Sequence, residues 1–137
     1  DQRGMEPAAR GRDGRTFRWG DDYRTGYDNI NETWDDAGEC NLAQTTIVGA
    51  YPQGASSEGV LDLAGNVWEW CLNKHEHPEA IELDTSGDAR VLRGGSWYGN
   101  QDVARCGERN WNDPAERNDN VGFRLVSSGP MADAFRG

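Results

Sequence analysis

The stretch GVLDLAGNVWEW at residues 59–70 carries most of the local hydrophobicity in a chain that is otherwise rich in polar residues. Its middle is interrupted by the pair Gly65 and Asn66, a combination that is typical of tight turns. The residues that follow, centred on Trp68 and Trp70, are therefore predicted to form a short buried strand. We expect these two tryptophans to belong to a hydrophobic core rather than to a platform on which a sugar stacks.

Three further stretches have the composition of strands. These are RVLRGGSW at residues 90–97, whose Trp97 is also expected in the core, the alternating VGFRLV at residues 121–126, and TTIVGAY at residues 45–51. The third is rich in β-branched residues and stops at Pro52, which cannot continue a sheet ladder.

Residues 98–120 separate two of these strands and are far more polar. Asn or Asp occupies six of the eleven positions 110–120. Because their side chains compete for nearby backbone hydrogen bonds, such residues disfavour the interior of a helix or strand. The segment is predicted to be a surface loop.

Composition limits the class of protein. The chain has 137 residues, 18 glycines and six tryptophans, which predicts one domain in which long helices are scarce. Its net charge of -10 disfavours nucleic acid and anionic membranes as partners. No apolar run is long enough for a membrane span, so no direct membrane insertion is expected and the chain should be soluble.

Neither the start of the chain nor its cysteines determine the cellular compartment. The start at Asp1, without a methionine or an apolar signal region, is interpreted as a fragment or a cleaved form. Three cysteines are too few for a disulfide scaffold. Surface-displayed, virion-associated and cytoplasmic locations all remain open.

Three blocks, in order, resemble one family: AARGRDGRTFRWG at residues 8–20, the block at 59–70, and RVLRGGSW followed by ARCGER, a proline and GFRLV across 90–126. They resemble the domain of the formylglycine-generating enzyme, or sulfatase-modifying factor, a variant of the C-type-lectin-like fold. The resemblance implies a single α+β domain over residues 1–137, rich in loops and with short antiparallel strands. It also implies that the family's usual N-terminal portion is missing.

The family includes copper-dependent oxidases, whose two copper-binding cysteines lie shortly after the Gly-Gly-Ser block. Residues 98–104 contain no cysteine here. Soft Cu(I) prefers thiolates, so no copper is expected and the chain is predicted not to be an enzyme. The alternative is an oxygen- or metal-dependent modifying enzyme of this family, and a purely structural accessory domain is a third hypothesis.

Residues 90–126 also resemble the variable segment of proteins that are diversified by retroelements. In such segments a fixed frame of residues, which here includes Arg93 and Arg117, alternates with variable positions. The residues at most of these variable positions can arise from an asparagine codon by changes of its adenines. Arginine has five donors with which to hold loop carbonyls, so the side chains between them could change without altering the core. The predicted function is non-catalytic binding of a variable macromolecular ligand, expected to be protein, and a homo-oligomer is left open.

Twelve residues are predicted to form the ligand surface, with aromatic anchors among adaptable polar groups. They are Tyr98, Asn100, Asp102, Glu108, Asn110, Trp111, Asn112, Asp113, Glu116, Asn118, Asp119 and Asn120.

Metal binding is a separate hypothesis. Asp62, Gly65, Val67 and Glu69 have the spacing of the family's calcium site, where two side-chain oxygens and two backbone carbonyls would meet the ion. In the alternative interpretation, Glu69 only accepts hydrogen bonds from neighbouring backbone amides.

Two weaker metal sites complete the set. A second calcium site is considered near Asn29, Ile30 and either Asp35 or Asp36. Cys71, His75 and His77 could ligate zinc, although two solvated histidines are the favoured interpretation.

Overall fold

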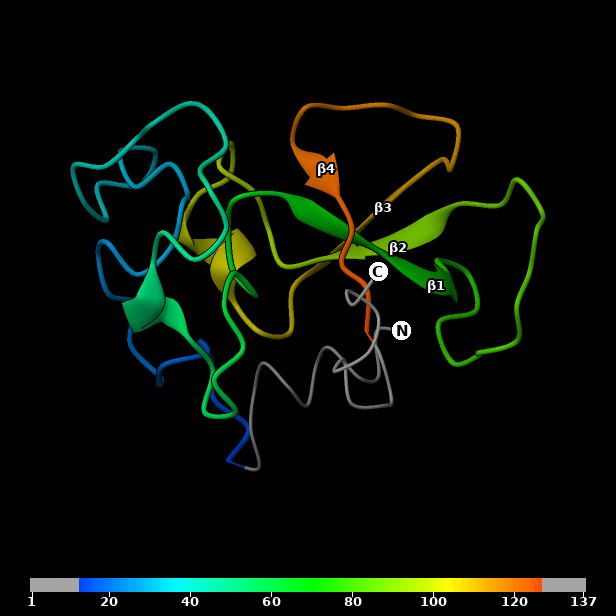
Figure 1. Ribbon diagram of the computed structural model, residues 1–137, viewed down its shortest axis with the longest axis horizontal. Coiled ribbons are helices and arrows are strands. Elements are labelled where there is room, and N and C mark those ends of the chain that lie inside the picture. The colour runs from blue at the N-terminus through cyan, green and yellow to red at the C-terminus, as the bar shows by residue number, and fades with distance from the viewer. Residues whose placement is uncertain (1–12, 127–137) are drawn as a thin grey trace, which may run out of the picture.

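The computed structural model describes residues 13–126, and long loops make up most of this part of the chain (Figure 1). The regular elements, in chain order, are η1 (Pro52–Gly54), β1 (Trp68–Lys74), β2 (Arg90–Arg93), η2 (Gln101–Ala104), β3 (Arg109–Asn112) and β4 (Val121–Gly122). Both helical elements among the described residues are short 3-10 turns. The expectation of a loop-rich fold with short strands is confirmed, whereas the helical part of an α+β fold is not.

The four strands form one sheet in the order β3-β2-β1-β4. β1 pairs antiparallel with β2, and β2 pairs antiparallel with β3. β4 runs parallel to β1, with Val121 opposite Trp68. The expectation of antiparallel strands alone is therefore wrong, because the loop after β3 carries the chain back across the sheet before β4 begins.

Two sequence predictions about strands are wrong in opposite directions. Residues 45–51 form no strand, and the Ile47 and Val48 side chains are 82% and 85% exposed. Side chains take the N–H groups of this segment: Gly49 donates to Asp62 Oδ2 over 2.7 Å. Conversely, the Asn-rich β3 is a strand because the edge of β2 offers it a complete ladder of partners, which outweighs its poor intrinsic propensity.

The predicted turn and strand in residues 59–70 are confirmed. Gly65 and Asn66 both adopt positive φ, and a Cβ on Gly65 would lie 2.5 Å from the carbonyl oxygen of Asn29. β1 then begins at Trp68, which is buried, and runs further than predicted. The expected strands at 90–97 and 121–126 also form, but only as four and two residues.

The core lies where the loops meet the sheet. One cluster joins Phe17, Ile30, Ala64 and Ala104, and a second joins Leu63 and Cys106. All four residues of β2 are buried. Trp68 belongs to this interior as expected, while Trp70 and Trp97 are half-buried.

A buried polar group fixes the loop at residues 26–40. The side chain of Glu32 is 1% exposed and accepts hydrogen bonds from the Tyr23 hydroxyl at 2.9 Å and the Gly26 N–H at 2.7 Å. Tyr23 also donates to Asp28, whose pKa is raised to about 7, mainly by burial. The carboxylate of Glu32 thereby positions the exposed residues that follow it.

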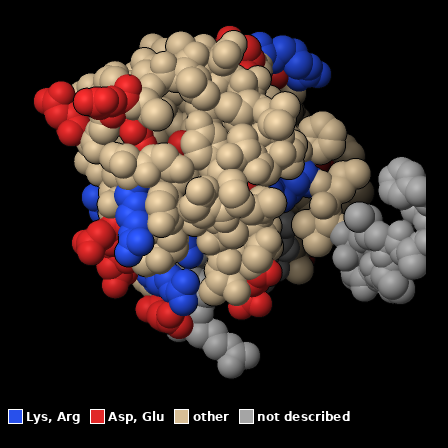
Figure 2. All heavy atoms as spheres, turned by 60° about the vertical axis from the view of Figure 1, so that its left-hand side comes forward, with Lys and Arg blue, Asp and Glu red and all other residues tan. Residues whose placement is uncertain are grey.

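The surface of the loop half is unevenly charged. Residues 40–57 contain no Asp, Glu, Lys or Arg, and Figure 2 shows a broad uncharged face with charged side chains gathered at its edges. Within residues 13–126, no helix has the length and apolar character needed to cross a membrane.

Candidate ligand-binding surface

The twelve predicted ligand residues share one property: none of them is buried. The nine exposed ones are Tyr98, Asp102, Glu108, Asn110, Trp111, Asp113, Glu116, Asn118 and Asp119, and the three half-buried ones are Asn100, Asn112 and Asn120. They lie on η2, β3 and the loops on either side, so one continuous piece of chain presents them to solvent.

Frame arginines hold the backbone of this segment. Arg93, which is 3% exposed on β2, donates from Nη1 to the carbonyl oxygens of Gly107 at 2.9 Å and Glu108 at 2.8 Å. Arg117 donates to the carbonyl oxygens of Pro114 and Glu116, each at 3.0 Å. The expectation that arginines satisfy the loop carbonyls is confirmed for these two residues. The exposed side chain of Glu108 is thus carried on backbone that a buried group holds.

Asn100 and Asn120 differ from the other predicted ligand residues because their side chains bond to distant segments of the chain. The side chains of Asp102, Asn110, Asn112 and Asp113 bond only to residues within three positions of their own. Asn100 caps η2 by accepting from the Asp102 N–H at 3.2 Å, and its amide donates to Asp35. Asn120 donates to Ser96 Oγ at 3.3 Å. These two positions are less free to vary than their sequence context indicated.

Aromatic contacts bring in residues that sequence reasoning did not assign to the surface. Tyr98 is 61% exposed and meets the ring of Trp34 edge to face, with centroids 6.0 Å apart. At the other end, Trp111 lies against His75 with centroids 5.4 Å apart. Only the tryptophan content of residues 17–34 signalled a role for Trp34, and no spacing linked it to Tyr98.

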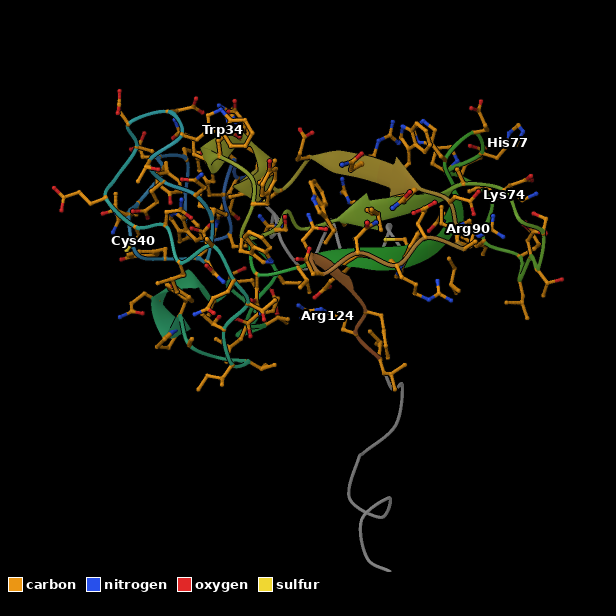
Figure 3. The ribbon with its side chains drawn as sticks, turned by 90° about the horizontal axis from the view of Figure 1, so that it is seen from above. Trp34, Cys40, Lys74, His77, Arg90 and Arg124 are labelled. Atoms are coloured by element: carbon orange, nitrogen blue, oxygen red, sulfur yellow. The ribbon has the colours of Figure 1, made fainter. Side chains whose placement is uncertain are left out.

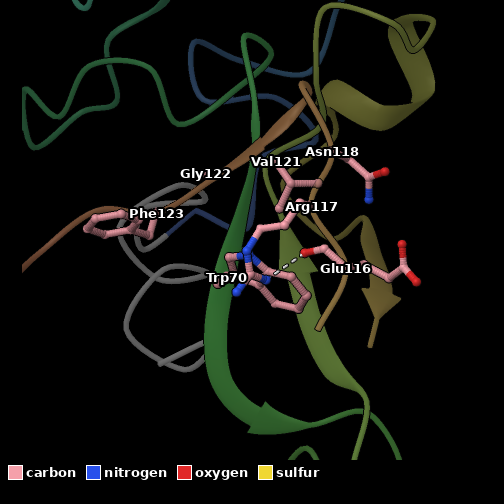
Figure 4. Close-up of a pocket in the computed structure, with 7 residues that line it drawn as sticks. All are labelled: Trp70, Glu116, Arg117, Asn118, Val121, Gly122 and Phe123. Carbon is pink, nitrogen blue, oxygen red and sulfur yellow. Dashed lines mark hydrogen bonds between the residues drawn. The ribbon is translucent and has the colours of Figure 1, made fainter. Parts of the chain in front are cut away.

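Two hollows flank the segment. One, of about 350 Å³, lies between Trp34, Tyr98 and the asparagines Asn110 and Asn120, with Trp68 also lining it. The other is larger, about 610 Å³, and its lining comes from β1, β4 and the loop between β3 and β4 (Figure 4). The segment therefore offers concave as well as exposed surface.

The residues predicted to bind calcium converge on a third hollow of about 190 Å³, which Asp62, Gly65, Val67 and Glu69 all line. However, both carboxylate oxygens of Glu69 accept from Arg124, at 2.6 Å from Nε and 2.5 Å from Nη2. In this arrangement the carboxylate of Glu69 is not available to a calcium ion, because the guanidinium of Arg124 already neutralises it. The alternative interpretation, in which Glu69 accepts hydrogen bonds from backbone amides, did not include Arg124 as its partner either.

Arg124 has further bonds that fix it in this place. It donates to the carbonyl oxygens of Leu61 at 3.0 Å and Asp62 at 2.6 Å. The Asp62 carboxylate itself accepts from the Gly49 N–H. Calcium at this place stays a prediction that requires Arg124 to move.

The weaker metal hypotheses gain no support from the geometry. Cys71 is buried on β1, where burial raises its pKa to about 11, while His77 is exposed beside Glu79. Asn29 is buried, and its side-chain amide donates to the carbonyl oxygen of Gln44 and to Asn66 Oδ1. Across residues 13–126, no three His, Cys, Asp or Glu side chains are grouped so that they could hold a metal ion.

Comparisons with known proteins agree with this architecture. Residues 2–128 match the sulfatase-modifying factor enzyme 1-like domain family. The solved structure of Treponema denticola variable protein 1 superimposes with a TM-score of 0.68 and 27% identity, over 89% of this chain and 44% of that one.

Two sequence relatives differ in what their names say about activity: one is named as an oxygenase and the other as inactive. Hercynine oxygenase of Mycolicibacterium smegmatis is 40% identical over 58% of this chain and 22% of its own length. Inactive C-alpha-formylglycine-generating enzyme 2 of Bos taurus is 33% identical over 89% of this chain and 41% of its own length. The chain thus spans less than half the length of each of these three proteins. Since the family match covers nearly all of its residues, the chain belongs to the sulfatase-modifying factor enzyme 1-like domain family.

Proposed function

We propose that the chain is a non-catalytic binding module whose variable segment, residues 90–126, is diversified by a retroelement to bind different protein ligands. The observation that carries this proposal is the separation of roles between backbone and side chain. Arg93 is buried and holds two loop carbonyls, while nine of the twelve predicted ligand residues project into solvent. Side chains that the core does not need can change without unfolding the domain.

The chemistry of the surface also supports protein recognition. Tyr98 and Trp111 are large, amphipathic and more than half exposed. Between them lie Asn and Asp side chains that can donate and accept hydrogen bonds in many geometries. Rigid aromatics among adaptable polar groups are the composition of antibody paratopes, where tyrosine and tryptophan supply most of the contact area. The likeness to Treponema denticola variable protein 1 supports the same assignment.

A display library tests the proposal. The nine exposed positions are randomised with the frame arginines kept, and folded clones are selected against a panel of unrelated purified proteins. We expect specific binders to several targets, with each clone as stable as the parent. A matched library that randomises an equal number of exposed positions in residues 39–48 is the control, and it should yield far fewer binders. Equal yields from the two libraries would contradict the proposal.

The second candidate is an oxygen- or metal-dependent modifying enzyme, and the likeness to hercynine oxygenase favours it. Metal analysis of the purified chain, followed by oxygen consumption with thiol and histidine-derived substrates, tests this candidate. Stoichiometric copper or iron together with oxygen uptake would support it over the binding module.

A further inference from the structure

The loop that follows Glu32 is tied to the variable segment at three points. The Asn31 N–H donates to the carbonyl oxygen of Gly99 at 2.8 Å, and Asn100 donates to the carboxylate of Asp35. Between these bonds, the ring of Trp34 meets that of Tyr98. A segment outside residues 90–126 thus forms one wall of the hollow of about 350 Å³ described above.

Trp34 is a poor candidate for a merely structural residue. Its side chain remains 57% exposed, although neighbouring Glu32 is fully buried. Figure 3 shows Trp34 at the loop end of the molecule, opposite the end that carries His77 and Lys74. Exposed tryptophan beside a concave surface is characteristic of residues that dominate the energy of protein interfaces.

The segment that carries this wall has charged side chains of a single sign. Residues 25–73, which carry Trp34, contain eight Asp and Glu but no Lys or Arg. Asn100, which lines the hollow, donates to the carboxylate of Asp35 and accepts from the backbone N–H of Asp102. Asp102 is already paired with Arg105 at 3.0 Å, whereas the bond to Asp35 comes from an uncharged amide. The carboxylate of Asp35 thus lies one hydrogen bond from the lining of the hollow, and the uncharged amide of Asn100 leaves its charge uncompensated.

We propose that this hollow binds a guanidinium or ammonium side chain of a protein partner, with Trp34 and Tyr98 contacting the cation and Asp35 pairing with it. The inference rests on the proposed function and adds a fixed element to it. Aromatic faces attract cations, and a carboxylate beside them supplies the counter-charge. Because Trp34 and Asp35 lie outside residues 90–126, every member of a diversified set would share these two contacts. Tyr98 and the positions further along the segment would set the remaining specificity.

The test uses the full chain and a small probe, because no partner is identified. N-acetyl-arginine methylamide is titrated, and the indole N–H resonance of Trp34 is followed by NMR after assignment through its loss in Trp34→Phe. The uncharged isostere N-acetyl-citrulline methylamide is the matched probe. We expect saturable shifts with the arginine probe and at least about fivefold weaker binding of the citrulline probe.

Variants separate the proposed contacts from general electrostatics. With binding followed in every variant through the backbone amide resonance of Tyr98, Trp34→Ala and Asp35→Asn should each weaken binding of the arginine probe at least about fivefold. Asp36→Asn removes the same charge one residue away and should change binding less than about twofold. Equal binding of the two probes, equal effects of the two Asp substitutions, or no shift at Trp34 would overturn the inference. Library binders that arise without any of these effects would leave the proposed function standing and remove only this subsite.

Discussion

The buried guanidinium of Arg93 donates a 2.8 Å hydrogen bond to the carbonyl oxygen of Glu108, whose own side chain is exposed. The side chain of a residue on a core strand thereby holds the backbone of the candidate ligand surface. The side chains of the ligand surface itself take no part in this bond. This division of roles distinguishes positions that must be kept from positions that can vary, and it leads to measurable differences between them.

Arg93→Lys should lower the free energy of unfolding by about 1–2 kcal/mol, because an ammonium cannot reproduce the guanidinium geometry and loses at least one of the two part-buried carbonyl bonds. Urea titration followed by tryptophan fluorescence measures the change. Arg105→Lys is the matched control: this arginine is half exposed, pairs with the exposed Asp102, and should change stability by less than about 1 kcal/mol. Similar losses in the two variants would show that Arg93 has no special role.

The asparagines should separate into two groups. Asn100→Ala removes the cap of η2 and should destabilise the chain by about 1 kcal/mol. Asn118→Ala removes an exposed side chain and should stay within about 0.5 kcal/mol of the parent. The comparison is made by thermal unfolding under identical conditions. A larger loss for Asn118→Ala than for Asn100→Ala would contradict the assignment of Asn100 as a support.

Arg124→Gln tests the relation between the ion pair and the predicted calcium site. The substitution frees Glu69 from its cation, so calcium should bind the variant at least about tenfold more tightly than the natural chain. Isothermal titration calorimetry with millimolar calcium measures both affinities, and Arg124→Gln with Glu69→Gln is the control that removes the carboxylate. Equal calcium affinity in the natural chain and in Arg124→Gln would show that Arg124 does not compete for this place.

Stability should depend on pH through Asp28. Burial raises its pKa to about 7 in the folded chain, well above the ordinary value of about 4. Between these values the carboxyl of Asp28 binds more protons in the folded state than in the unfolded state. Its contribution to stability is therefore fully present below pH 4 and is lost, by a few kcal/mol, as pH rises through 7. Asp28→Asn should flatten this part of the profile. Urea midpoints measured from pH 4 to 8 in both chains check the prediction, and parallel profiles would contradict it.

The turn at Gly65 and Asn66 and the strand that follows could be predicted from sequence because their signals are local. A Gly-Asn pair and two closely spaced tryptophans determine conformation with little help from the rest of the fold. The exposure of residues 98–120 was predictable for the same reason, since asparagine and aspartate are rarely buried without partners. These local signals located the surface but did not describe how it is built.

Contacts between distant segments could not be predicted in this way. β3 forms because β2 offers its edge, and residues 45–51 stay irregular because side chains from residues 62 and 66 take their N–H groups. Likewise, nothing in the spacing of Trp34 and Tyr98 or of Glu69 and Arg124 indicated that these pairs meet. In each case contacts between distant segments, rather than the intrinsic propensity of the local sequence, determine the structure.

The central claim is tested most directly by the stability of a chain in which all nine exposed ligand residues are replaced together by serine or alanine. The account predicts a folded domain whose free energy of unfolding lies within about 2 kcal/mol of the parent, because the supporting arginines and asparagines remain. Arg93→Ala in the parent should be more damaging than the nine replacements combined. An unfolded ninefold variant beside a folded Arg93→Ala would contradict the account.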